Sequence, residues 1–307
     1  MSDFNAHDPV PAASMAPERD VNARIARLRI YPVKSLGGIE LRSAVLQTTG
    51  LQWDRHWMVV DAEGVFVSQR ELARMALVQP ELRESTLALH APGRPTLELS
   101  LQALGPQRQV QVWDDTVAAL DMGNAAAQWL QQSLGTAGLQ LVRFDPAVRR
   151  ECSRKWTQGL LAQTQFADGY PVLVCTSTAV DELNALLAAQ GEAAVGMERF
   201  RPNIVLDDTL AHDEDHWSEM DVLGAPDNPS AVLASLRLVK PCARCPIPDI
   251  DPATGVSHPA VGDTLRAYRQ DARVNGAITF GMNAIVTQGA GALLQVGQRV
   301  QASYAFS

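Results

Sequence analysis

Residues 26–38 of the chain read ARLRIYPVKSLGG, and the fold prediction starts from this stretch. Apolar and polar side chains alternate from Ala26 to Tyr31, which is the pattern of a half-buried β-strand. Pro32 ends that strand, and residues 33–38 form a glycine-containing turn. The turn leads into a second predicted strand from Ile39 to Leu46, so the stretch predicts two strands joined by a short connection.

The rest of the first half continues this strand-rich pattern. A hairpin is predicted where residues 57–60 and 65–67 flank a loop that contains Gly64. A helix is predicted to begin at the capping residue Asn124, with Ala127, Leu130 and Leu134 on one face. Further strands are predicted at residues 86–90, 96–101, 109–113 and 139–144. Because turn residues separate these strands at short intervals, the pattern indicates β-rich, barrel-like packing.

The second half begins after residues 145–170, which are polar and irregular and predict a boundary or a mobile loop. Residues 171–175 predict a short buried strand. The hydroxyl side chains of residues 176–178 are suited to capping the helix that follows, whose apolar face contains Leu183 and Leu187. The overall prediction is a mixed α+β fold in which strands dominate and are mainly antiparallel.

The composition is that of an ordinary soluble globular protein. Of the 307 residues, 46% are hydrophobic and 20% are charged. The net charge of -8 argues against a nucleic-acid partner, because neutralising phosphates requires a clustered basic surface. The first twenty residues lack the apolar segment of a signal peptide, and no stretch reaches the roughly 18 apolar residues of a membrane span. We therefore expect a cytoplasmic protein without a membrane association.

Four cysteines are present, at positions 152, 175, 242 and 245, and in a cytoplasmic protein we expect them to be reduced. Residues 241–251 read PCARCPIPDID and follow a predicted strand, so Cys242 and Cys245 are expected on a loop. Arg244 would favour the thiolate form of Cys245, which ligates metals. Three other interpretations stay open: a structural zinc site, a redox-active pair and two ordinary core residues. Zinc would need further ligands, and Pro246 blocks the helix that a thioredoxin-like pair requires.

A second group of polar residues is suited to binding an anion. Lys34 and Ser35 stand on the glycine-containing turn, Arg55 precedes a strand, and Arg201 and Asn203 open another. Ammonium, guanidinium and hydroxyl donors together bind phosphates and carboxylates, although each residue alone could be an ordinary surface group.

One acidic run and two histidines are not expected to bind a ligand. Residues 213–215 read DED and predict a solvated acidic loop, while His216 and His258 are single histidines without partners.

Five segments together resemble the MOSC superfamily, in the branch whose MOSC domain follows a β-rich MOSC N-terminal region. This branch includes the mitochondrial amidoxime-reducing components and their bacterial relatives. The segments are YPVKS at 31–35, DRHW at 54–57, RFRPNI at 199–204, CARC at 242–245 and DPATG at 251–255. The resemblance implies a MOSC β-barrel and a second β-rich region. It divides the chain into a flexible leader (1–21), an N-terminal region (22–147) whose first part packs with the later domain, and a MOSC domain (148–304).

The resemblance also implies a site for the molybdenum cofactor, Mo-molybdopterin. The second cysteine of the family's pair ligates molybdenum, which makes Cys245 the expected metal ligand and catalytic residue. The expected cofactor-binding residues are Lys34, Ser35, Arg55, Thr176, Ser177, Arg201, Asn203 and Arg244. An acidic residue near the metal in relatives has no secure counterpart, and Asp207 and Asp208 are the nearby candidates.

The implied reaction is reduction of small N-hydroxylated compounds, such as amidoximes or N-hydroxylated bases. The chain has no ferredoxin-like cysteine cluster, so we expect a separate soluble protein to donate the electrons. Three alternatives remain. The protein could carry the cofactor or transfer sulfur without turnover, it could bind pyridoxal phosphate through Lys34, or it could be a non-catalytic module that binds zinc. The sequence predicts no oligomeric state.

Overall fold

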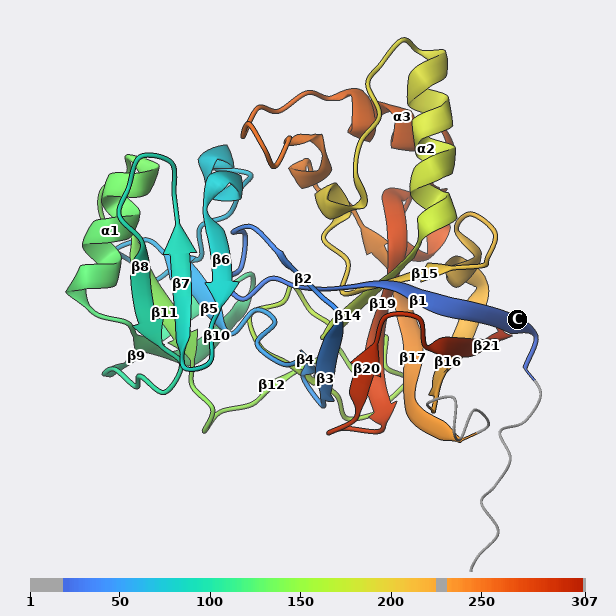
Figure 1. Ribbon diagram of the computed structural model, residues 1–307, viewed down its shortest axis with the longest axis horizontal. Helices are drawn as coiled ribbons and strands as arrows, with labels where there is room; N and C mark the ends of the chain where they lie inside the picture. Colours follow the sequence, from blue (N-terminus) through green and yellow to red (C-terminus); the bar gives the residue numbers. More distant parts are fainter. Residues whose placement is uncertain (1–18, 225–230, 306–307) are drawn as a thin grey trace, which may run out of the picture.

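The computed structural model describes residues 19–224 and 231–305. Residues 1–18 of the predicted leader lie outside the described residues. The first strand begins at Val21. The molecule has two β-rich parts, and Figure 1 shows them side by side. Within the described ranges, no helix combines the length and the apolar character needed to cross a membrane.

The larger part is a closed barrel of seven strands within the described residues. In spatial order its strands are β14 (Val172–Thr176), β15 (Ile204–Asp207), β1 (Val21–Ile30), β21 (Arg299–Tyr304), β16 (Trp217–Leu223), β17 (Val232–Ala243) and β19 (Ala277–Gln288). The ring closes because β14 also pairs with β19. Shorter strands extend or flank it: β2 (Ile39–Leu41), β3 (Ser43–Gln47), β4 (Gly50–Leu51), β18 (Gln270–Asp271) and β20 (Leu293–Gln295).

The smaller part contains two sheets and one helix. One sheet has the order β5 (Trp57–Val60), β11 (Gln140–Phe144), β10 (Asp115–Asp121), β9 (Gln107–Val112), and the other has the order β6 (Gln79–Leu82), β7 (Thr86–His90), β8 (Leu97–Ser100). The helix α1 (Asn124–Leu134) packs beside them. A short pair, β12 (Arg150–Glu151) with β13 (Gln163–Thr164), lies in the segment that joins the two parts.

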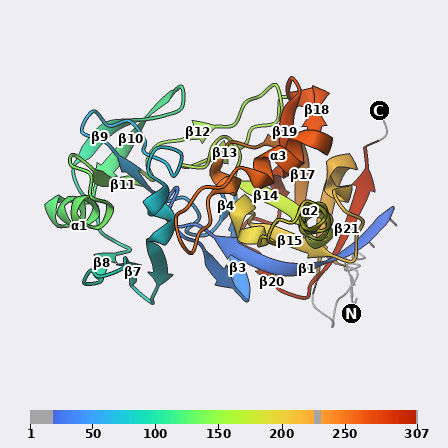
Figure 2. The ribbon, with the colours of Figure 1, turned by 90° about the horizontal axis from the view of Figure 1, so that it is seen from above.

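The barrel is covered by helices at one end, as Figure 2 shows from above. These are α2 (Ser177–Ala189) and α3 (Ala260–Tyr268), accompanied by the 3-10 turns Met197–Phe200, Asp213–His216, Ile247–Asp249 and Ala272–Val274. A further 3-10 turn, Ala73–Leu77, belongs to the smaller part. Among the named strands of the described ranges, β14 and β15 are the single parallel pair. The predicted strand-dominated, mainly antiparallel α+β fold is confirmed.

Strand β1 belongs to the barrel, although it comes first in the chain. It pairs with β15 on one side and with β21 on the other. Its buried positions change parity, from Val21 and Ile25 to Leu28 and Ile30, because the register with β15 shifts between Ile25 and Arg27. This bulge turns Ala26 away from the core, so the predicted inward position of Ala26 is wrong.

The turn after β1 joins the two parts of the molecule. The Lys34 amide donates a 2.8 Å hydrogen bond to the Trp57 carbonyl, which binds the turn to the start of β5. Gly38 follows where the backbone passes the buried ring of Tyr31. A Cβ at Gly38 would lie 2.5 Å from a ring carbon of Tyr31, so this close approach requires glycine.

Both predicted helix starts differ in detail from the structure. Gly123, with φ 87°, is the N-cap of α1, so Asn124 is the first helical residue rather than the cap. Ala126, and not Ala127, joins Leu130 in the core. Thr176 is the N-cap of α2, but no side-chain hydrogen bond caps that helix. The Thr176 hydroxyl instead donates to Glu214 at 2.8 Å, because a buried carboxylate competes for it.

A buried arginine, Arg150, fixes the position of the joining segment, residues 145–170. Arg150 forms an ion pair with Asp115 at 2.7 Å. Its guanidinium also donates to the carbonyls of Gln165 and Ala167, at 2.8 and 2.6 Å. These contacts hold the segment between the smaller part and the barrel, next to the cavity described below.

Candidate functional site

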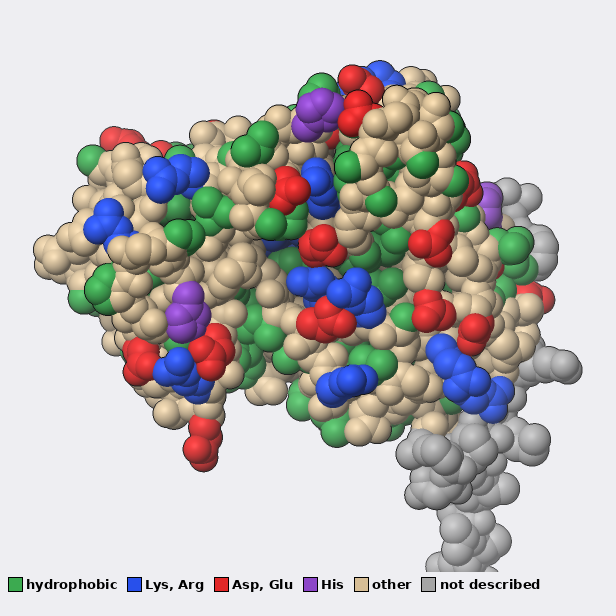
Figure 3. All heavy atoms as spheres, turned by 45° about the horizontal axis from the view of Figure 1, so that its top comes forward, with side chains coloured by type: hydrophobic (Ala, Val, Ile, Leu, Met, Phe, Trp, Pro, Cys, Tyr) green, Lys and Arg blue, Asp and Glu red, His purple; other side chains and the backbone are tan. Residues whose placement is uncertain are grey.

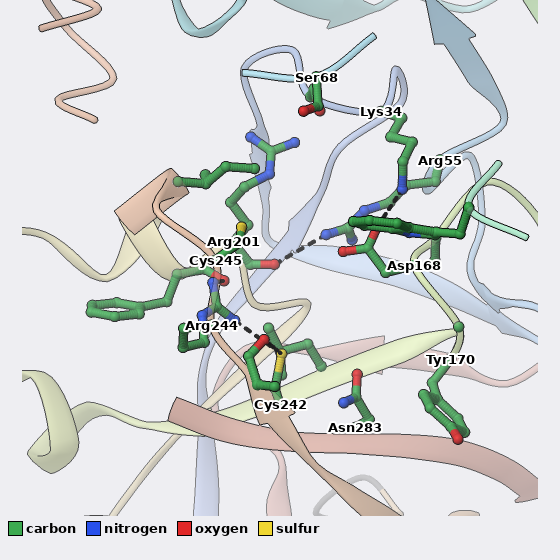
Figure 4. A pocket seen from close by; sticks show the side chains of 18 of the residues that line it. Lys34, Arg55, Ser68, Asp168, Tyr170, Arg201, Cys242, Arg244, Cys245 and Asn283 are labelled. Atoms are coloured by element: carbon green, nitrogen blue, oxygen red, sulfur yellow. Dashed lines mark hydrogen bonds and ion pairs between the residues drawn. The ribbon is translucent and has the colours of Figure 1, made fainter. Parts of the chain in front are cut away.

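A cavity of about 380 Å³ lies where the smaller part, the joining segment and the barrel meet. It brings together seven of the predicted site residues: Lys34, Ser35, Arg55, Arg201, Asn203, Arg244 and Cys245. Figure 4 shows Lys34, Arg55 and Asp168 on one side, and Cys242, Arg244 and Cys245 on another. Figure 3 shows Lys and Arg side chains, with Asp and Glu beside them, on the surface between the two parts.

Thr176 and Ser177 do not line this cavity, and their predicted cofactor contact is not supported. Thr176 is bound to Glu214, and the Ser177 hydroxyl bonds to Asp207. Ser177, Asp207 and Asp208 line a separate open recess, so the two acidic candidates also lie outside the cavity. The reason is that the carboxyl end of β14 leads away from the cavity, whereas the residues that precede β14 border it.

The segment that precedes β14 supplies residues that the sequence analysis missed. Asp168, Gly169 and Tyr170 line the cavity. Lys240 and Asn283 do so from β17 and β19, and their side chains carry no spacing or motif that marks them. The sequence offered one signal for the segment, since the Asp168-Gly169 pair indicates a turn shortly before a buried strand.

Lys34 is buried at one side of the cavity and holds a carboxylate there. Its ammonium donates to the Phe166 carbonyl at 2.8 Å and forms an ion pair with Asp168. Burial lowers the pKa of Lys34, and the charge of Asp168 opposes this. Desolvation acts to raise the pKa of Asp168, but the charge and hydrogen bond of Lys34 prevail and hold that pKa well below its usual range.

Two arginines meet on the buried ring of Tyr31. The guanidinium carbons of Arg55 and Arg201 lie 4.4 and 4.2 Å from the ring centroid. Such cation–π contacts hold two like charges in place although they repel each other. Burial lowers the pKa of Arg201 to about 10.

Hydrogen bonds fix the same two arginines. Arg55 pairs with Asp54 at 2.6 Å and donates to the Asn203 side-chain oxygen at 3.2 Å. Arg201 donates through Nη1 to the Leu36 carbonyl at 2.8 Å. The second nitrogen of Arg201, Nη2, is buried and has no partner.

The two neighbouring thiols have different surroundings. Cys242 is part of β17, and Cys245 follows it on the loop, so only one of the pair is on the predicted loop. Arg244 donates to the Cys242 sulfur at 3.0 Å and to the Phe200 carbonyl at 2.8 Å. The hydrogen bond thus goes to Cys242, while the charge of Arg244 acts on both Cys242 and Cys245. Burial acts to lower the pKa of Arg244, but the neighbouring thiols raise it.

Strained backbone is concentrated at the cavity. Nine non-glycine residues of the described ranges have positive φ, and four of them line it. They are Ser35 (66°), Arg55 (50°), Trp113 (55°) and Arg201 (59°). Such conformations persist only where the surrounding structure imposes them, and they cluster at functional sites.

The charges and unpaired donors of the cavity fit an anionic ligand. Six basic side chains line it, from Lys34, Arg55, Arg70, Arg201, Lys240 and Arg244, against the two carboxylates of Asp114 and Asp168. The difference, six minus two, is four positive charges in a protein of net charge -8. Arg201 Nη2 and Arg244 Nε are buried without partners. Native proteins rarely leave buried donors unpaired, so a bound ligand would account for both.

The same cavity offers thiols for a metal. Cys242 and Cys245 both line it, and a thiolate is a soft ligand. Within residues 19–224 and 231–305, no group of three or more His, Cys, Asp or Glu side chains is arranged to hold a metal by itself. The residues thus fit a group that brings its own ligands and needs one thiolate, such as a pterin-bound molybdenum.

The acidic run at residues 213–215 was predicted wrongly as a solvated loop. Asp213, Glu214 and Asp215 are all buried, and they lie outside the cavity. Asp215 pairs with Arg269, and Asp213 accepts a 3.2 Å hydrogen bond from the Trp217 indole. The sequence shows the charges but not these partners, which make their burial possible.

Family models match both parts of the chain. The MOSC N-terminal beta barrel domain matches residues 22–137, and the MOSC domain matches residues 162–301. The chain belongs to the MOSC family. The resemblance drawn from the five sequence segments is thereby confirmed. The predicted boundary between residues 147 and 148 falls in the interval between the two matches and stays a prediction.

The relatives of this MOSC protein include amidoxime-reducing components and a molybdenum cofactor sulfurase. It is 32% identical to mitochondrial amidoxime-reducing component 1 of Mus musculus over 254 residues, which cover 80% of this chain and 71% of that protein. It is 31% identical to mitochondrial amidoxime reducing component 2 of Homo sapiens, with 80% and 72% covered. It is also 30% identical to molybdenum cofactor sulfurase of Drosophila grimshawi, with 86% of this chain but only 32% of that protein covered.

Proposed function

We propose that this protein binds a molybdenum cofactor and uses it to reduce N-hydroxylated compounds, such as amidoximes, to the corresponding N–H compounds with release of water. One observation carries the proposal: Cys245 lines the same cavity as the converging cations Lys34, Arg55 and Arg201. The names of the amidoxime-reducing relatives support the reaction, and the molybdenum cofactor sulfurase supports the cofactor.

Different residues of the cavity hold different parts of the cofactor. Lys34, Arg55 and Arg201 bind its anionic end, with the free donor of Arg201 available for an oxygen of the ligand. Cys245 supplies the thiolate to the metal. When bound, the cofactor supplies the two-electron redox chemistry, while the chain orients it and limits access of water. The hydrogen bond from Arg244 keeps the Cys242 sulfur occupied, which leaves Cys245 as the available ligand.

The proposal is tested first by analysing the protein purified from a host that makes the cofactor. We expect molybdenum near one atom per chain and a releasable molybdopterin. Zinc in place of molybdenum would refute the proposal, and an absorption spectrum typical of bound pyridoxal phosphate would favour binding through Lys34 instead.

The two cysteines provide a sharper test. Replacing Cys245 by Ser should abolish N-reduction and change the spectrum of the metal while the protein stays folded, because the serine hydroxyl stays protonated at neutral pH. The matched variant Cys242→Ser should retain activity and lose on the order of 1 kcal/mol of stability. Equal loss of activity in both variants would indicate a paired-cysteine site.

A separate protein should donate the electrons. We expect turnover when a small redox protein and its reductase are added, and no steady turnover with a nicotinamide nucleotide alone. Transient redox partners bind through small interfaces, so saturation should need a high concentration of the donor. Turnover with the nucleotide alone would contradict this part of the proposal.

A cofactor carrier or sulfur-transfer protein is the second candidate, because the match to the sulfurase relative covers 86% of this chain at 30% identity. It predicts molybdenum in the purified protein but no N-reduction with any electron donor. The metal analysis and the turnover assay together separate the two functions.

A further inference from the structure

An aromatic cluster lines the part of the cavity formed by the smaller β-rich part, and the proposed cofactor contacts do not use it. It consists of Phe66, Arg70 and Trp113, which we call the Trp113 cluster. The ring centroids of Phe66 and Trp113 are 5.0 Å apart. The Arg70 guanidinium lies 4.3 Å from the Trp113 ring and 5.7 Å from the Phe66 ring.

Trp113 lies in a tight hairpin loop, where a small or polar residue is usual. Val112 pairs with Asp115, so Trp113 and Asp114 form a two-residue hairpin loop. Loops of this length favour Asn, Asp or Gly, because the backbone must adopt positive φ. Trp113 has φ 55°, and 39% of its surface remains exposed. Folding alone would be served better by a small residue here, so the exposed indole calls for a functional explanation.

The orientation of the indole is fixed relative to the rest of the cavity. The Trp113 Nε1 donates a 3.0 Å hydrogen bond to Asp168 Oδ1, the same oxygen that pairs with Lys34. The Arg70 guanidinium makes a further contact with the ring. The indole is thus a preorganised flat surface, and preorganisation lowers the entropy that a ligand loses on binding.

We propose that Trp113 is a specificity-determining residue that stacks against the flat conjugated group of the substrate, such as an aromatic amidoxime or an N-hydroxylated heteroaromatic base. This rests on the proposed function, because it names the substrate class of the same site. Aromatic rings attract each other beyond the area that they bury. The guanidinium of Arg70, and the Lys34 ammonium 5.4 Å from the Phe66 ring, make a cationic substrate unfavourable at this cluster.

The test uses two ligands that share the reacting group and differ in aromaticity. Benzamidoxime and cyclohexanecarboxamidoxime have rings of similar size, but only the first is flat and conjugated. Their dissociation constants are measured by calorimetry on the protein as purified from a host that makes the cofactor, without reductant, so that neither ligand turns over. The wild type should bind the aromatic ligand about threefold to tenfold more tightly.

Three variants separate stacking from other effects. Trp113→Leu removes the aromatic surface and should bring the ratio of the two constants close to one. Trp113→Phe keeps an aromatic surface without the N–H donor to Asp168, and it should keep most of the preference. Trp129→Leu is the matched control, because Trp129 lies on α1, its indole donates to the Pro95 carbonyl, and it does not line the cavity. Its ratio should equal that of the wild type.

The proposal is overturned if the wild type shows no preference or if Trp113→Leu retains it. It is also overturned if Trp113→Phe loses the preference as fully as Trp113→Leu, since the hydrogen bond to Asp168 would then be responsible. The ratio of the two dissociation constants is measured without turnover, so its outcome is independent of whether the protein catalyses N-reduction. An active molybdenum protein with a ratio of one would refute the stacking role alone. A protein without molybdenum that shows the expected ratios would refute the proposed function alone.

Discussion

Replacing Glu214 by Gln should make the protein more stable at high pH, because the buried carboxyl group favours its neutral form. Glu214 is fully buried. Burial raises its pKa to about 7 from the ordinary 4.5, and the nearby charge of Asp215 adds to this effect. The hydrogen bonds that Thr176 donates, at 3.2 Å from its amide and 2.8 Å from its hydroxyl, oppose the rise without cancelling it.

The direction follows from the protons that each state binds. Between about pH 4.5 and 7 the unfolded chain releases the Glu214 proton while the folded chain keeps it, so stability falls as pH rises. The contribution is fully present below about pH 4.5 and is lost above about pH 7. At roughly 1.36 kcal/mol for each pKa unit, the total is about 3 kcal/mol. Glutamine has no proton to release, so the variant lacks this loss of stability. Its Oε1 can accept from the Thr176 amide, while its Nε2 donates to the Thr176 hydroxyl oxygen, which then accepts instead of donating.

The assay is urea unfolding of wild type and Glu214→Gln at a series of pH values from 5 to 8. The difference in free energy of unfolding should be small near pH 5 and should grow to as much as about 3 kcal/mol in favour of the variant at pH 8. Glu84→Gln is the control, because it makes the same substitution at an exposed position. A Glu214→Gln variant that is less stable than wild type at pH 8, or a difference independent of pH, would refute the reasoning.

Two further predictions concern the core and the cavity. Leu183→Ala, at a fully buried position of α2, should lower the free energy of unfolding by about 2–5 kcal/mol in urea, whereas Leu186→Ala on the exposed face of the same helix should change it by about 0.5 kcal/mol or less. Lys34→Met should leave the protein folded, as circular dichroism would show, but should reduce the molybdenum retained after dialysis, because the cavity loses a buried cation. Unchanged retention would contradict the anion-binding role of Lys34.

The strand pattern and the family were predictable from the sequence because both depend on local information. Side chains alternate along a strand with a period of two. The alternation at residues 26–31 therefore predicts a strand, whatever the position of that strand in the fold. The bulge between Ile25 and Arg27 was not predictable. It depends on the register with β15, a strand far away in the chain, and it reverses which side chains of β1 face the core.

The site was predictable where a recognised segment carries the residue. Lys34, Arg55, Arg201 and Cys245 come from four such segments, and they line one cavity. The prediction that Thr176 and Ser177 contact the cofactor rested mainly on their hydroxyl groups. In the structure neither residue lines the cavity. Asp168 does line the cavity, but its role depends on Lys34 and Trp113, and no spacing in the sequence connects these three residues.

By itself, the sequence determined the strand-dominated fold class, the family and the set of cationic and thiol groups that line the cavity. Only the tertiary structure decided which charged groups are buried and with which partners. Glu214 and Asp215 sit in a run that the sequence presents as solvated, yet their partners Thr176 and Arg269 come from 38 and 54 residues away. A buried charge is stable only when a partner reaches it, and the fold brings that partner from a distant segment.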